Sequence, residues 1–271
     1  MFLTAFLLFL FALIYSIPMS AHRLMQLDRY LFNARAAFLI SAIAMFALFG
    51  NALIAYSLLS MPPSSAHLIQ RSETIFTILL GVMFLKERGL LALSLSILLF
   101  SVGLYVMNQS AFEQFDAELF PLLAAIGSAL CFTAMQGLAR MLLPVMSSHV
   151  INTARLLLLV IALSFLFPDL LNQLRVLPRE AFIQCALAAF FGPFIGRLAY
   201  MNASRYIGIA KTALSASLSP IYTLVLQILL TSIVITANQW IGSFLLILAV
   251  SLPALTKACK HLPKIPHRHT K

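Results

Sequence analysis

The sequence predicts an all-α polytopic membrane protein with about nine transmembrane helices. Hydrophobic residues make up 62% of its 271 residues and charged residues only 10%, whereas a soluble domain carries about a quarter of charged residues. The mean hydropathy is +0.99. Apolar stretches of about 20 residues recur along the chain, which is the length of a membrane-spanning helix; the strands of a barrel are shorter and alternate.

The spans follow one another with short linkers. In chain order they are expected over residues 2–18, 36–58, 65–85, 89–107, 119–138, 148–167, 181–202, 209–231 and 237–256. The first of them lacks the basic start and the small-residue cleavage site of a signal peptide, so we expect it to remain as a span. The most polar linker lies at 108–118. It separates residues 1–108 from 119–257, and residues 258–271 form a basic tail.

The distribution of charge predicts the orientation. The linkers on one side of the membrane hold most of the Lys and Arg residues, while those on the other side hold only Arg175 and Arg179. By the positive-inside rule the C-terminus is cytoplasmic, and nine spans then leave the N-terminus outside. The same distribution accounts for the net charge of +10 without a nucleic-acid partner. The three cysteines have no metal-like spacing and no catalytic motif is present, so no metal, cofactor or enzyme activity is expected.

The third span carries charges well inside an apolar segment, at Arg71 and Glu73. A charge at this depth costs at least a few kcal/mol, so it normally faces the interior of a bundle or a wet cavity. A helical projection collects the polar side chains on one arc: His67, Gln70, Arg71, Glu73, Thr74 and Thr77. The alternative is a structural role for Arg71 and Glu73, with neighbouring helices supplying their partners.

The eighth span has a polar arc of the same kind. Its members are Lys211, Thr212, Ser215, Ser219, Tyr222, Thr223 and Gln227. Pro220 breaks this helix and frees a backbone carbonyl. Each hydroxyl taken alone can serve packing, but the face as a whole predicts a cavity lining. Arg155 lies about two turns inside the sixth span, where a functional and a structural contact are both open; Arg197 and Lys211 lie close enough to span ends to reach the interface.

An internal repeat relates the two halves. Ile75-Phe76-Thr77 matches Ile221-Tyr222-Thr223, and Ala55-Tyr56 matches Ala199-Tyr200. The first four spans therefore pair with the last four, and the fifth span has no partner. Matched spans lie five apart, so they cross the membrane in opposite directions. Such an inverted repeat places a binding site between the halves near the midplane.

These patterns resemble the EamA repeat of the drug/metabolite transporter superfamily. The segments that carry the resemblance are AHLIQRSETIFTILLGVMFLKER and GRLAYMNASRYIGIAKTALSASLSPIYTLVLQ. Pro220-Ile221 matches the Pro-Val/Ile core of the family's cavity helix, and Leu85-Lys86-Glu87 matches its Leu-x-Glu end. Thr74 replaces the proline in the first half, and Ile233 stands where the second half should have glutamate. Since members have ten spans, the resemblance implies a first repeat without its first helix.

The resemblance implies secondary transport by alternating access in the cell (inner) membrane, with export of amino acids or related small metabolites. The alternative is a lipid-linked-sugar flippase, or an accessory membrane subunit, of the same fold. Arg71 or Arg155 would pair with a substrate carboxylate, and Glu73 would take an amine or a coupling proton. No clear GxxxG face occurs, and the oligomeric state stays open, with a monomer favoured. The predicted cavity consists of Gln70, Arg71, Glu73, Thr77, Arg155, Ser219, Tyr222, Thr223 and Gln227, with the helix break at Pro220.

Overall fold

Every regular element in the described part of the chain is a helix. The computed structural model describes residues 2–24, 34–61, 66, 69–84, 90–107, 109, 119–169, 172, 177–219, 221–222, 225 and 236–261. Its helices are α1 (Phe2–Leu24), α3 (Ala34–Ser60), α5 (Ser72–Met83), α6 (Leu90–Met107), α8 (Leu119–Leu142), α9 (Ser148–Leu166), α11 (Arg179–Ala189), the π-helix η1 (Phe190–Gly196), α12 (Arg197–Ile207), α13 (Ile209–Ala216) and α15 (Ala237–His261).

The helices confirm a multi-pass membrane protein. Four of them are long and apolar enough to cross a bilayer: Ala34–Ser60, Leu119–Leu142, Ser148–Leu166 and Arg179–Ile207. Shorter apolar helices cover Leu3–Met19, Ser72–Met83, Ala92–Met107 and Ala237–Pro253. Each predicted span overlaps at least one described helix, while the number of nine crossings stays a prediction.

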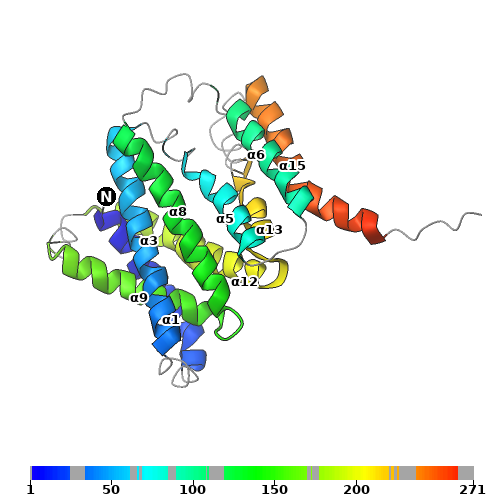
Figure 1. Cartoon of the computed structure of the whole chain (residues 1–271). Coiled ribbons are helices and arrows are strands. Elements are labelled where there is room, and N and C mark those ends of the chain that lie inside the picture. The colour runs from blue at the N-terminus through cyan, green and yellow to red at the C-terminus, as the bar shows by residue number, and fades with distance from the viewer. Residues whose placement is uncertain are drawn as a thin grey trace, which may run out of the picture.

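The helices pack in two groups that meet through α5. In one group α3 lies against α8 and α1 against α9; in the other α6 lies against α15, as Figure 1 shows at its upper right. Helix α5 contacts α8 of the first group and α6 of the second, and it also contacts α13, which packs against α15 of the second group. Large apolar side chains cover the outside, such as Phe38 at 71% and Phe165 at 83% exposed. An apolar surface of this extent is what a lipid-facing protein presents.

Three of the four helix pairs that the internal repeat matches in sequence are also in contact with each other. These pairs are α1 with α9, α5 with α13 and α6 with α15. In the fourth pair, α3 packs mainly against α8, and also against α9. Helix α8 belongs to the span for which the repeat predicts no partner. The inverted repeat stays a prediction.

Glycine allows the close crossing of α6 and α15. A Cβ atom on Gly242 would lie 2.6 Å from the Cβ of Met107 and 2.7 Å from the carbonyl oxygen of Gly103. Both distances are shorter than real Cβ contacts, and backbone atoms cannot turn aside as a long side chain can. The two helices therefore have to separate if any side chain is introduced at this position.

We expect Gly242→Ala to lower the free energy of unfolding by about 1–3 kcal/mol, the usual cost of overpacking. Gly192→Ala is the control, because its Cβ would meet no atom within 4 Å. Alanine lowers the backbone entropy of the unfolded chain in both variants. The difference between their free energies of unfolding therefore reports the cost of a side chain at the crossing of α6 and α15. Thermal unfolding in detergent measures it. Equal stability of the two variants would show that the crossing tolerates a side chain.

Candidate functional site

Helix α5 begins in the middle of the predicted third span, at Ser72. Arg71 precedes it in a turn, and the carbonyl oxygen of Arg71 accepts a hydrogen bond from the amide of Thr74 at 3.0 Å. Glu73 lies in the first turn, where the unpaired amides and the positive end of the helix dipole favour a carboxylate. The single continuous helix expected here is therefore interrupted at Arg71. His67 lies outside the described residues.

The side chain of Gln136 on α8 is the centre of the polar network. Its amide nitrogen donates to Oε1 of Glu73, and its own oxygen accepts from the hydroxyl of Tyr200. Thr77 Oγ1 donates to the same oxygen at 3.5 Å. Gln136 is only 6% exposed, so these contacts satisfy polar atoms that would otherwise be buried without partners. One side chain thus connects α5, α8 and α12.

Thr133 extends the network along α8. Its hydroxyl lies 3.3 Å from the hydroxyl of Thr77, and it donates to the backbone oxygen of Glu73 at 3.4 Å. Gln70 contacts a different part of α8, where its amide donates to Ser128 Oγ at 3.4 Å. Ser128 in turn donates to the carbonyl of Gly50 at 2.8 Å. Gln70 therefore ties the residues before α5 to α8 and α3, outside the network around Gln136.

A cavity of about 190 Å³ lies over this network. It brings together three of the predicted residues, Arg71, Glu73 and Thr77. Thr74, which the helical projection placed on the polar arc, lines it as well. The remaining members of the lining were not predicted from the sequence: Gln136, Arg197, Tyr200, Ala213 and Ala216. Two signals were available for them: a glutamine inside the unpaired fifth span, and the repeat match of Tyr200 with Tyr56.

A second cavity of about 430 Å³ shares Arg197 and Tyr200 with the first. Arg155, another predicted residue, lines it and is only 5% exposed. The sequence placed Arg197 near a span end, but its guanidinium is turned inward, with Cζ 5.6 Å from the centroid of the Tyr200 ring. The π-helix η1 precedes Arg197 directly, and its wider turn changes which face of the span the following residues occupy.

The eighth span differs from the predicted polar face. Helix α13 ends at Ala216, so a projection from Lys211 to Gln227 does not describe one helix. Tyr222 is 64% exposed and does not line the two cavities. Ser219 is half-buried beyond the end of α13. Pro220, Thr223 and Gln227 lie outside the described residues.

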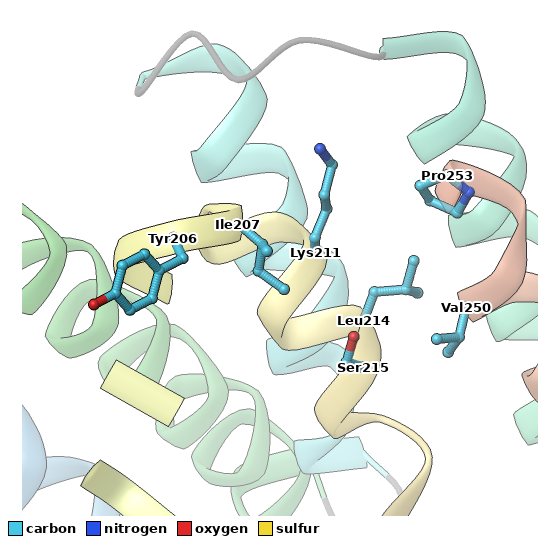
Figure 2. A pocket seen from close by; sticks show the side chains of 7 residues that line it. All are labelled: Tyr206, Ile207, Lys211, Leu214, Ser215, Val250 and Pro253. Atoms are coloured by element: carbon cyan, nitrogen blue, oxygen red, sulfur yellow. The ribbon is translucent and has the colours of Figure 1, made fainter. Parts of the chain in front are cut away.

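Two faces of α13 line different cavities. Ala213 and Ala216 line the cavity of Arg71 and Glu73. Lys211 and Ser215 line another cavity of about 310 Å³, together with Val250 and Pro253 of α15, and Figure 2 shows Lys211 extending from α13 on this side. In the described part of α13, small apolar residues rather than the predicted polar ones therefore face the charged network.

The fold and the site define a helical membrane protein with charged and polar residues around internal cavities. The family model of the EamA-like transporter family matches residues 119–254, half of the chain. The protein belongs to this family, so it is a membrane transporter of the drug/metabolite transporter type. Such proteins are transporters and not enzymes.

Solved structures show the same fold. One crystal structure aligns with a TM-score of 0.75 at 17% identity, over 94% of this chain and 89% of the other. An identity this low supports the fold alone. No curated protein matches the chain.

Proposed function

We propose that this transporter exports small polar metabolites, such as amino acids or related compounds, across the cell (inner) membrane by alternating access. Its C-terminus would lie in the cytoplasm. The observation that carries the proposal is the cavity in which Arg71 and Glu73, at the interrupted start of α5, face Arg197 and Tyr200 of α12. Ionisable groups at membrane depth usually mark a substrate or ion pathway.

The position of the cavity supports alternating access. Its lining comes from α5 in the first predicted repeat and from α12 and α13 in the second. In transporters built from inverted repeats, the substrate site lies between the repeats and interrupted helices supply its polar groups. The start of α5 at Ser72 and the end of α13 at Ala216 provide two helix ends near this cavity.

The charged residues have complementary roles in the proposal. Arg71 or Arg155 would bind a substrate carboxylate, because a guanidinium donates two parallel hydrogen bonds to it. Glu73 would bind an amine or carry a coupling proton. In the structure, Glu73 accepts a hydrogen bond from the neutral amide of Gln136. A substrate can replace this amide without leaving a charged group of the protein unpaired. During alternating access, contacts within the protein at this cavity would be replaced by contacts between the protein and the substrate.

A comparison of metabolite pools tests the function. Cells overproducing the intact protein are compared with cells overproducing the Arg71→Ala, Glu73→Gln double variant, and metabolites are measured inside and outside. The expected result is one class of metabolite that leaves the cell only with the intact protein. The control double variant, Arg205→Ala with Glu180→Gln, removes one charge of each sign from exposed helix ends and should export normally. Identical pools for intact and double-variant protein, with both in the membrane, would contradict solute export.

The same fold could serve as a lipid-linked-sugar flippase or an accessory subunit, and one observation favours this second candidate. An apolar cavity of about 350 Å³ lies between α1, α3 and α9 and would accept an acyl or prenyl chain. A flippase would change the leaflet distribution of a labelled lipid in proteoliposomes without any change in soluble pools. An accessory subunit would act only together with a second membrane protein.

A further inference from the structure

Two buried arginines face a very weak acceptor. Arg155 Nη1 lies 3.8 Å and Arg197 Nη2 lies 3.0 Å from the sulfur of Met135. A thioether is a poor hydrogen-bond acceptor and carries no charge. In the described part of the chain, Nε of each arginine is buried without a hydrogen-bond partner. Buried cations are normally paired with an anion, and neither arginine forms an ion pair with a carboxylate in the described part of the chain.

Among the described residues, the partners of these arginines are neutral or are already hydrogen-bonded to another side chain. Arg155 Nη2 donates to Asn152 Oδ1 at 3.0 Å, and Asn152 is neutral. Asn152 in turn donates to the carbonyl of Pro193 at 3.2 Å, which fixes the orientation of its amide. Glu73 acts electrostatically on Arg197, but its Oε1 already accepts from Gln136. The two guanidinium groups also repel one another.

The cavity beside these arginines has room for a ligand. At about 430 Å³ it falls within the range of small-molecule pockets. Gly192 lines it, and a Cβ atom there would meet nothing within 4 Å. The cavity also adjoins the apolar cavity of about 350 Å³, since Ala5, Leu8, Phe9 and Asn51 line both. Two cationic groups therefore lie at one end of a space that becomes apolar away from them.

We propose that Arg155 and Arg197 bind the carboxylate of a small organic acid whose apolar body extends toward α1, α3 and α9. This inference rests on the proposed function and narrows its substrate class to acids with an apolar part. Arginine forks match a carboxylate in plane and charge, and the acid would neutralise the repulsion between the two groups. The Tyr200 hydroxyl and the Gln136 amide connect this site to Glu73 in the adjoining cavity.

Binding to the purified full-length protein in phosphatidylcholine nanodiscs tests the inference. Benzoate is the probe; benzamide has the same shape without the charge, and acetate has the charge without the apolar body. We expect benzoate to raise the melting temperature, benzamide to have no effect, and acetate to bind at least about tenfold more weakly. Arg155→Gln and Arg197→Gln should each weaken benzoate at least about tenfold, since hydrogen bonds to charged groups are strong ones. Arg205→Gln, at an exposed position, should bind benzoate as the intact protein does.

A second readout separates ligand binding from a structural role. Because Arg155 is buried and pairs with no carboxylate in the described part of the chain, Arg155→Gln removes a desolvated charge, and the ligand-free melting temperature should rise while benzoate binding falls. An arginine that merely supports the fold would give a lower melting temperature. Arg197→Lys keeps the charge and loses the planar fork, so it should fold and bind benzoate more weakly even if a glutamine variant does not fold.

The outcomes distinguish this inference from the proposed function. Equal binding of benzoate and benzamide, or benzoate binding that the arginine variants leave unchanged, would overturn it even if metabolite export depends on Arg71 and Glu73. Benzoate binding without any export would leave the anion site in place and overturn the transport proposal. Phosphatidylglycerol nanodiscs test the other source of an oxyanion: if that lipid displaces benzoate only when Arg155 and Arg197 are intact, the site belongs to a lipid headgroup and the organic-acid assignment fails.

Discussion

Replacement of Gln136 by leucine is expected to reduce export at least about tenfold, because one side chain serves three helices. Leucine removes the donor to Glu73 and the acceptor for Tyr200 and Thr77. A half-buried carboxylate and a phenol then lose their partner, each at about 1–3 kcal/mol. Gln136→Leu should therefore also lower the melting temperature. The measurement is export of the metabolite that the pool comparison identifies, together with thermal unfolding.

Met141→Leu is the matched control for this variant. It introduces the same residue on the same helix, at a position that is 48% exposed and takes no part in the hydrogen bonds around Gln136. Export and melting temperature should stay at the level of the intact protein. Normal export by Gln136→Leu would show that Glu73 and Tyr200 do not depend on this contact for transport.

Replacement of Ala216 by leucine is expected to block export while the fold persists. Ala216 lies at the end of α13 and lines the cavity of about 190 Å³ that Arg71 and Glu73 face. A leucine side chain would occupy part of that volume and narrow the space that a substrate needs beside both charges. Since Ala216 is exposed to the cavity and not packed in the core, we expect the free energy of unfolding to change by no more than about 0.5 kcal/mol.

The adjacent residue provides the control. Ser215→Leu adds the same side chain one position earlier, on the face of α13 that lines the cavity of Lys211 and Val250 (Figure 2). Export at least about tenfold lower in Ala216→Leu than in Ser215→Leu would assign the pathway to the Glu73 side of α13. Equal export by the two variants would exclude the 190 Å³ cavity from the pathway.

The sequence predicted the helical membrane fold because hydropathy and span length are local properties. Arg71 and Glu73 were found for the same reason: a charge inside an apolar segment is visible without any tertiary information. Gln136 was not selected, because a single amide in a membrane helix often serves only packing, and its importance comes from partners 63 and 64 residues away. Tyr222 was selected through a helical projection that assumed one unbroken helix, and α13 ends before it.

Arg197 shows why position along a span does not fix the role of a residue. Its distance from the predicted end suggested contact with the membrane interface, yet its guanidinium lies against Met135 and Tyr200. A projection along the span cannot anticipate this, because it assumes 100° per residue throughout. The π-helix before Arg197 departs from that period.

The π-helix η1 therefore changes the direction in which side chains point between the first and the second half of one membrane-spanning segment. Its i→i+5 pattern places an additional residue in the turn, which rotates everything after it by about 100° relative to an unbroken α-helix. Ile183 and Leu187 before it are more than half exposed on the outer surface, whereas Arg197 and Tyr200 after it face the cavities. One membrane-spanning segment can thus present apolar side chains to the outer surface in its first half and charged and polar side chains to the cavities in its second half. The additional residue in the π-helix produces this change of face.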